Sequence, residues 1–279
     1  MDRVPDQSTE GSGTLTYDAP LILRCQTLRP KDSADDGTVA DRQKKVPGFS
    51  QEAFSELTVL VVGAGALGGE IAEGLVRKGV GTVRILDFDT VELSNLNRQF
   101  FFAKDVSRPK AWALARNLEP HGAMGTRIIA WNMAFENAQA AGVDLSCDVV
   151  VSAVDDGETR AAIAQFARDQ GIPALFGGAS EQADYANLFI QEVGGTCFAC
   201  GFPGAEGAGR TPCPGSPAIK DLFKQLGGLV LYAIDTLFMS RPRTWSLHTL
   251  CPADATFTRS GRVERRAGCP ICGGDPPSI

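Results

Sequence analysis

The feature that most constrains the fold is a glycine-rich turn between a strand-like segment and a helix-like segment. The run from Leu57 to Val62 is apolar and rich in β-branched residues, as in a strand buried on both faces of a parallel sheet. The turn Gly63-Ala-Gly65-Ala-Leu-Gly68 follows, and Ile71 and Leu75 then continue at helical spacing. Small residues at such a turn let backbone N–H groups and the helix N-terminus approach a phosphate. The sequence therefore predicts a βαβ unit that binds a nucleotide.

Further segments continue the alternation of strands and helices. Strand-like runs occur at residues 83–86, 148–154 and 172–176, and residues 158–170 have a helical pattern. A chain of 279 residues with 43% hydrophobic residues can bury one large core. We expect an α/β, Rossmann-like, doubly wound fold with a mostly parallel sheet and a zinc-stabilised C-terminal subdomain.

Composition divides the chain into three parts. Residues 1–40 are polar and acidic, except for β-favouring runs within residues 14–28 that predict an accessory hairpin or arm, with a partly ordered tail as the alternative. Residues 41–196 form the expected nucleotide-binding core. Residues 197–279 contain a long loop rich in Gly and Pro at 201–218 and a cysteine pair near the end.

Charge and hydropathy exclude two classes of partner. The formal net charge of −6 argues against nucleic-acid binding, which needs a clustered basic face. The apolar stretch 227–238 is too short to span a membrane and carries Asp235. Because residues 1–13 do not resemble a secretory signal, we expect a cytoplasmic protein.

Charged residues after the second strand distinguish between nucleotides. Asp87 follows that strand, where a carboxylate can accept hydrogen bonds from ribose hydroxyls, and this alone fits NAD and ATP equally. Asp89, Asn95 and Arg98 then crowd the strand end, which a dehydrogenase does not require. The segment L-D-F-D-T-V-E-L-S-N-L-N-R-Q-F resembles the ThiF/MoeB/HesA superfamily of ubiquitin-activating-like enzymes, and the match extends from about Arg42 to Cys272.

The resemblance implies roles for individual residues. Asp87 binds the ribose of ATP and Arg98 its phosphates, with Asp89 and Asn95 in the same site, and Lys110 neutralises charge as pyrophosphate departs. Asp155 holds Mg²⁺, although Asp156 replaces the asparagine that is common in the family, which leaves the choice between the two slightly open. The element around Arg42 implies an arginine that reaches the ATP of a neighbouring protomer, and hence a homodimer.

Four cysteines form two C-x-x-C pairs. Each pair places two thiols on a tight turn followed by glycine, the geometry that a tetrahedral zinc site needs. Disulfides are not expected in a cytoplasmic chain. We therefore predict one closed structural zinc site formed by Cys197, Cys200, Cys269 and Cys272.

Cys213 lies in the long loop, between two prolines. In the superfamily this loop carries the cysteine that forms a thioester or persulfide with the activated carrier, so the resemblance makes Cys213 a candidate nucleophile, and an incidental loop thiol is the alternative. His248 and Cys251 form an H-x-x-C pair, which indicates a second metal site, a replacement metal ligand or a structural pair.

The resemblance implies ATP-dependent adenylation of the C-terminal glycine of a ubiquitin-like or sulfur-carrier protein, and it leaves sulfur transfer and conjugation both open. Transfer to Cys213 and then to a conjugating enzyme would be the further steps. Two alternatives come from other classes: a NAD(P)-dependent dehydrogenase, which leaves Arg98, Lys110 and Asp155 without a role, and a non-catalytic scaffold that binds a carrier tail.

Overall fold

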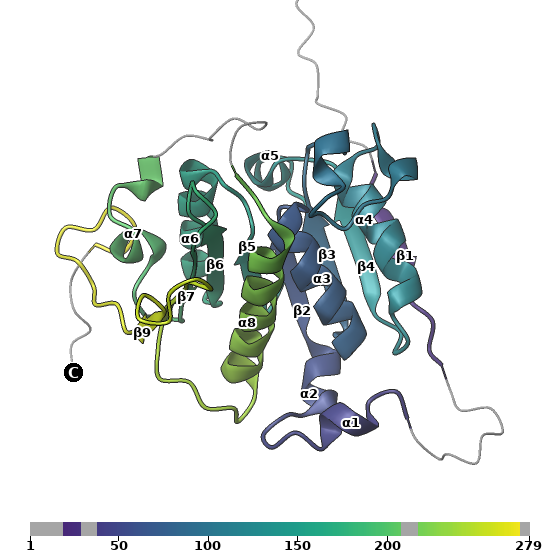
Figure 1. Cartoon of the computed structure of the whole chain (residues 1–279), viewed down its shortest axis with the longest axis horizontal. Coiled ribbons are helices and arrows are strands. Elements are labelled where there is room, and N and C mark those ends of the chain that lie inside the picture. Colours follow the sequence, from purple (N-terminus) through teal and green to yellow (C-terminus); the bar gives the residue numbers. More distant parts are fainter. Residues whose placement is uncertain (1–18, 29–37, 208–216, 274–279) are drawn as a thin grey trace, which may run out of the picture.

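The fold is one nine-stranded sheet with helices on both faces, in a computed structural model that describes residues 19–28, 38–207 and 217–273 (Figure 1). The strand order is β1-β4-β3-β2-β5-β6-β7-β8-β9. The strands are β1 (Leu21–Arg24), β2 (Thr58–Val62), β3 (Thr82–Leu86), β4 (Arg127–Trp131), β5 (Val149–Ser152), β6 (Ala174–Ala179), β7 (Ala186–Gln191), β8 (Leu247–Leu250) and β9 (Arg259–Gly261).

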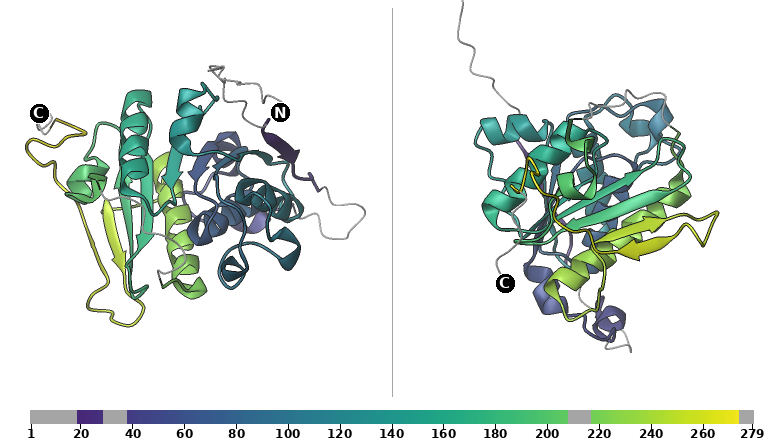
Figure 2. Two further views of the ribbon diagram at one scale, coloured as in Figure 1. Left: turned by 90° about the horizontal axis from the view of Figure 1, so that it is seen from above. Right: turned by 90° about the vertical axis from the view of Figure 1, so that its left-hand side faces the viewer.

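The five central strands, β4-β3-β2-β5-β6, are parallel, and antiparallel strands extend the sheet at both edges. The predicted Rossmann-like α/β fold is therefore confirmed. The segment expected to form an accessory hairpin or arm instead supplies the edge strand β1, which pairs with β4 over residues 21–24. Figure 2 shows β1 and the C-terminal part of the chain at opposite ends of the sheet.

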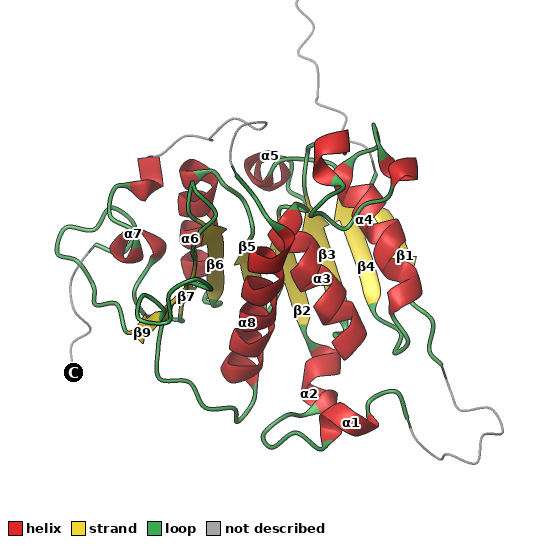
Figure 3. Cartoon of the chain, viewed as in Figure 1, coloured by secondary structure: helices red, strands yellow, loops and turns green. Residues whose placement is uncertain are grey.

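Helices cover the sheet in two layers. The α-helices are α1 (Asp41–Lys44), α2 (Gln51–Glu56), α3 (Ala66–Lys78), α4 (Lys110–Leu118), α5 (Phe135–Ala140), α6 (Gly157–Gln170), α7 (Phe198–Gly201) and α8 (Lys220–Phe238). Short 3-10 helices are η1 (Leu93–Asn95), η2 (Ala103–Asp105), η3 (Glu119–His121) and η4 (Ala205–Gly207). Figure 3 shows α3, α4 and α8 in front of the strands.

The alternation of side chains in the central strands explains these layers. Val59 and Val61 of β2 pack in one buried cluster with α2, α3, α4 and α8, whereas Leu60 and Val62 pack in a second cluster with α5, α6 and α7. Because successive strand residues face opposite sides, an apolar strand without polar alternation must be covered on both faces. The uninterrupted run from Leu57 to Val62 indicates this burial.

The apolar helix α8 lies against α3 and the sheet. Its Leu226, Val230 and Ile234 are each 0% exposed, so the apolar stretch 227–238 belongs to a core helix. No helix of the described segments has the length and hydrophobicity that a membrane crossing requires.

Candidate nucleotide-binding site

A pocket of about 650 Å³ opens where the five parallel strands end. The chain proceeds from β2 through β3 to β4 on one side and then crosses to β5 and β6 on the other, so the strand order reverses between β2 and β5. Ligands of open α/β sheets bind at such a reversal, beyond the carboxyl ends of the strands. The volume is within the usual range for small-molecule sites.

The glycine turn forms the floor of this pocket, and its three glycines differ in what surrounds them. Gly63 has φ of +98°, and a Cβ there would lie 2.7 Å from the carbonyl oxygen of Ala153. A Cβ on Gly68 would lie 1.9 Å from the carbonyl oxygen of Gly63, whereas one on Gly65 would meet nothing within 4 Å. Gly63 and Gly68 therefore let the backbone close the turn, and Gly65 leaves space above it that a ligand can occupy.

The N-terminus of α3 faces this space. Gly65 is its N-cap and, having no side chain, provides no side-chain cap to the first turn. The first backbone N–H groups of an α-helix have no partner within the helix and carry the positive end of its dipole. The turn therefore offers hydrogen-bond donors to an anion such as a phosphate.

Asp87, at the end of β3, is bound to the same turn. Its Oδ2 accepts a hydrogen bond from the N–H of Ala64 at 2.6 Å, and its Oδ1 accepts one from the N–H of Asp89 at 2.8 Å. Burial raises the pKa of Asp87 above its ordinary value, although Lys110 and these N–H groups favour the ionised form. This carboxylate is thus held at the pocket wall, where ribose hydroxyls could be bound.

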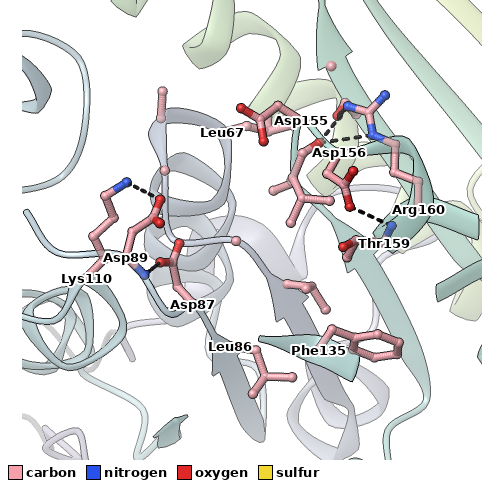
Figure 4. A pocket seen from close by; sticks show the side chains of 18 of the residues that line it. Leu67, Leu86, Asp87, Asp89, Lys110, Phe135, Asp155, Asp156, Thr159 and Arg160 are labelled. Carbon is pink, nitrogen blue, oxygen red and sulfur yellow. Dashed lines mark hydrogen bonds and ion pairs between the residues drawn. The ribbon is translucent and has the colours of Figure 1, made fainter. Parts of the chain in front are cut away.

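Two basic side chains line the same side. Lys110, at the start of α4, is 9% exposed, and its Nζ lies 2.9 Å from Oδ2 of Asp89 (Figure 4). Arg98 donates to the carbonyl oxygen of Ser94 at 2.6 Å and to Oδ1 of Asn97 at 2.9 Å. The structure therefore brings Asp87, Asp89, Arg98 and Lys110 into one pocket.

Asn95 occupies a different position from these four residues. It is 4% exposed, its Oδ1 accepts the N–H of Glu92 at 3.0 Å, and it is not among the described residues that line the pocket. Its side chain and that of Glu92 form a reciprocal cap of η1. The structure places Asn95 in the framework of the loop that carries Arg98.

The opposite wall carries two adjacent carboxylates after β5. Asp156 caps α6, because its Oδ2 accepts the N–H of Thr159 at 2.7 Å. Asp155 is exposed and lines the pocket, and Figure 4 shows the two carboxylates pointing in different directions. Asp155 is therefore better placed than Asp156 to meet a metal ion carried by a ligand.

Arg160, which ends the Asp-Asp-x-x-x-Arg pattern that begins at Asp155, also lines this wall. It donates to the carbonyl oxygen of Val154 through Nε at 3.0 Å and Nη2 at 2.7 Å, and burial lowers the pKa of the guanidinium. A Cβ on Gly178 would lie 2.6 Å from Nη2. Arg160 thus braces the strand ends around Asp155.

Two segments with no motif also line the pocket: residues 133–136 follow β4, and residues 177–181 span the end of β6. The only available signal for them was that each follows a parallel strand. Their assignment needed the strand order, because the sequence does not say which strand ends are neighbours.

Arg42 lies far from this pocket in its own chain. It is exposed on α1, and the adjacent Gln43 donates to the carbonyl oxygen of Lys78, at the C-terminal end of α3, at 2.9 Å. The pocket is at the other end of α3, and a helix of 13 residues is about 20 Å long. Contact with a nucleotide in the same pocket is therefore excluded by distance, and the role in a partner's site stays a prediction.

The four predicted zinc ligands form one cluster beside α7. The sulfur atoms of Cys197, Cys200, Cys269 and Cys272 all lie within 4.8 Å of one another. The separations are 3.3 Å for Cys197–Cys269, 3.5 Å for Cys200–Cys272 and 3.8 Å for Cys197–Cys200. Thiolates around a tetrahedral zinc ion are about 3.8 Å apart, so the cluster can hold zinc.

The backbone supports this cluster, since the N–H of Arg266 donates to the sulfur of Cys200 at 3.2 Å. His248 and Cys251 take part in no comparable group among the described residues, and His248 contacts Ser260 through Nδ1 at 2.6 Å. Cys213 lies outside the described residues.

Comparisons with known proteins agree with this geometry. The ThiF family model matches residues 40–269. The sulfur carrier protein adenylyltransferase of Thermus thermophilus is 29% identical over 234 residues, which are 81% of this chain and 86% of that protein. The molybdopterin-synthase adenylyltransferase of Escherichia coli is 29% identical over 243 residues, 84% of this chain and 95% of that protein.

A crystal structure of E. coli MccB with ATP has a similar fold, with a TM-score of 0.68 at 16% identity over 80% of this chain and 68% of that chain. The family match covers most of the chain and includes the glycine turn, the Lys110 helix and the first three cysteines of the cluster. The chain belongs to the ThiF family.

Proposed function

We propose that this chain uses ATP to adenylate the C-terminal glycine of a small ubiquitin-like or sulfur-carrier protein. The carrier carboxylate attacks the α-phosphorus, the bond to the pyrophosphate oxygen breaks, and acyl-adenylate and pyrophosphate form. No strong general base is needed, since a carboxylate is already ionised at neutral pH. Positioning and charge neutralisation then supply the catalysis.

The observation that carries the proposal is the joint placement of Asp87, Arg98, Lys110 and Asp155 around the uncapped N-terminus of α3. Asp87 would bind the ribose, the α3 turn a phosphate, and the two basic residues the charge of the departing pyrophosphate. A dehydrogenase has no use for such a distribution of charge. The names of the two relatives with high coverage, both adenylyltransferases, support the same reaction.

The charge of the lining supports a magnesium cofactor. Among the residues that the structure describes, three basic side chains and seven carboxylates line the pocket: Arg98, Lys110 and Arg160 against Asp87, Asp89, Glu136, Asp155, Asp156, Glu158 and Glu181. ATP is itself an anion, so an excess of carboxylates would repel it unless a cation accompanies it. Asp155 would supply a hard oxygen ligand to Mg²⁺.

ATP–pyrophosphate exchange with candidate carriers that end in glycine tests the proposal. We expect exchange with the wild-type chain, and a loss of about 10²-fold or more in Asp155→Ala. Asp156→Ala is the matched control, which should keep most of the exchange and lose about 1 kcal/mol of stability with its helix cap. ATP binding without exchange for any carrier would favour the scaffold alternative.

Two finer steps belong to the same proposal. Cys213 would accept the acyl group as a thioester and pass it to a conjugating enzyme, and Arg42 would complete the pocket of a partner protomer in a homodimer. A carrier adduct sensitive to thiols that persists in Cys213→Ser would rule out the first step. For the second, inactive Arg42→Ala and inactive Asp155→Ala chains should restore exchange when mixed, since a hybrid dimer would contain one intact site.

A further inference from the structure

The chain leaves the pocket after Arg98 and returns to it at Lys110. A buried pair of an acid and an amide, outside the pocket, holds this segment in place. Asp105, at the end of η2, is 2% exposed, and Asn117, in α4, is 4% exposed. Neither is among the residues found to line the pocket in the described part of the chain. Buried polar groups of this kind are rarely kept without a partner or a role.

Their hydrogen bonds join three points of the segment. Nδ2 of Asn117 donates to Oδ2 of Asp105 at 2.8 Å and to the carbonyl oxygen of Phe100 at 3.1 Å. The N–H of Phe102 donates to the same Oδ2 at 2.9 Å, and the N–H of Arg108 donates to the carbonyl oxygen of Asp105 at 3.0 Å. The pair therefore holds the segment to α4 at Phe100, two residues after Arg98, and at Asp105, whose backbone carbonyl in turn binds Arg108, two residues before Lys110.

The same segment is pressed against α3. A Cβ on Gly69 would lie 3.0 Å from Cβ of Phe100, so the backbone of α3 and Phe100 approach closely there. Gly69 follows Gly68 in the first turns of the helix that opens on the pocket. The glycine turn, the Arg98 loop and the Lys110 helix are thus fixed relative to one another through Phe100 and the Asp105–Asn117 pair.

We infer that Asp105 and Asn117 are positioning residues that set the separation between the Arg98 guanidinium and the Lys110 ammonium across the phosphates of ATP. The inference rests on the proposed function for the roles of those two cations. It extends that proposal, because it makes a pair outside the pocket responsible for the affinity of the site for a triphosphate. A buried hydrogen-bond network is rigid. Small displacements of the charged groups that it positions in a binding site reduce their interaction with the ligand.

Substitutions can separate this role from simple stability. Asn117→Ala removes both donated bonds and leaves a buried carboxylate short of a partner. Asp105→Asn should be tolerated, because the two bonds to the side chain share Oδ2 and an amide oxygen can accept both. Gln191→Ala is the matched control, since Gln191 is 1% exposed and bridges Ala164 and Phe198 on the other face of the sheet.

The experiment is calorimetric titration of the full chain with ATP and Mg²⁺ and, separately, with AMP. AMP lacks the β- and γ-phosphates that the two cations would hold. We expect Asn117→Ala to weaken ATP binding at least 10-fold and AMP binding less than 2-fold. Asp105→Asn should keep both affinities within 2-fold, and Gln191→Ala should lower the thermal midpoint without changing the ratio of the two affinities.

Equal weakening of ATP and AMP in Asn117→Ala, or no change in either, would overturn the inference. So would a loss of the ATP preference in Gln191→Ala, because the effect would then follow from general destabilisation. A wild-type chain that binds ATP but catalyses no exchange would contradict only the proposed adenylation, since the ATP-to-AMP comparison needs no carrier. If Asn117→Ala does not fold, Asn117→Ser, which removes the amide donor with less loss of polarity, gives the same comparison.

Discussion

The nucleotide pocket and the cysteine cluster lie at different parts of the same sheet, and they differ in how exposed their polar groups are. The pocket lies at the ends of parallel strands, with an uncapped helix N-terminus and an exposed Asp155. The cluster lies beside the antiparallel part of the sheet, with Cys197 at 0% and Cys269 at 3% exposure. An open set of polar groups suits a ligand that comes and goes, whereas a closed four-thiol set suits a permanent ion. We therefore expect the first region to control activity and the second stability.

Removal of metal from the cysteine cluster should have the largest effect on stability. Cys269→Ser, or treatment with a strong chelator, should lower the free energy of unfolding by about 4 kcal/mol or more, because loss of a structural metal is among the most destabilising changes. Denaturant titration measures the loss, and metal analysis should find one zinc per chain in the wild type. An unchanged midpoint after complete metal removal would contradict a structural role for the cluster.

Substitution of Lys110 should reduce activity without affecting the metal site. Lys110→Ala should lower the exchange rate about 10²- to 10³-fold, the usual cost of a lost charge-stabilising group, and leave the zinc content unchanged. Lys104→Ala is the control, since Lys104 is exposed in the same segment and stacks on Phe102. Steady-state exchange assays measure the rate of each variant relative to wild type. Equal losses of exchange rate in Lys110→Ala and Lys104→Ala would mean that any substitution in this segment impairs the enzyme and that Lys110 has no specific catalytic role.

Substitutions at two of the three glycines of the turn, Gly65 and Gly68, should separate an effect on ATP binding from an effect on stability. Gly68→Ala should destabilise the chain by about 1–3 kcal/mol, because its Cβ would overlap the carbonyl oxygen of Gly63. Gly65→Ala should leave stability nearly unchanged and still weaken ATP binding, because its Cβ would enter open space above the turn. Thermal unfolding and ATP titration measure the two effects. If ATP binds Gly65→Ala with wild-type affinity, the phosphate does not lie on this turn.

The smallest expected effect concerns Asp87 and pH. Burial raises its pKa in the folded chain, whereas the pKa is about 3.9 when unfolded. The unfolded chain thus loses this proton first, and stability falls as pH rises from about 4 through the folded pKa. Asp87→Asn cannot titrate, but its single amide oxygen can accept only one of the two N–H bonds, so the nucleotide-free variant should be less stable than wild type. In thermal melts this deficit should shrink as pH rises from 4 to 7, because only the wild type loses stability over that range. A deficit that grows as pH rises would contradict the assigned direction.

The sequence predicted the two regions unequally. The cysteine cluster followed from spacing alone, since two C-x-x-C pairs leave little choice of partners. In the pocket, Asp87 was predicted from its place after a strand, whereas Lys110 and Asp155 were predicted only from the resemblance to the ThiF/MoeB/HesA superfamily. Residues 133–136 and 177–181 were missed, because their place depends on which strand ends become neighbours.

Local hydrogen bonding decided the remaining assignments. Asn95 and Asp156 share residue types and sequence neighbourhood with ligand-binding residues, but they cap η1 and α6. Whether a short polar side chain binds its own backbone or a ligand depends on loop conformation, which spacing does not reveal. The β-favouring character of residues 14–28 was recognised, but the pairing of β1 with β4 was not, because β4 lies about a hundred residues further along the chain.

The most direct test of the central claim is to identify what is released from ATP and what is joined to the carrier. The chain should be incubated with Mg²⁺, ATP and a carrier ending in glycine, and the products analysed by mass spectrometry and phosphorus NMR. We predict pyrophosphate and a carrier bearing AMP on its terminal carboxylate in equal amounts, and neither with Asp155→Ala. Release of orthophosphate and ADP, or an unmodified carrier in the presence of bound ATP, would contradict it.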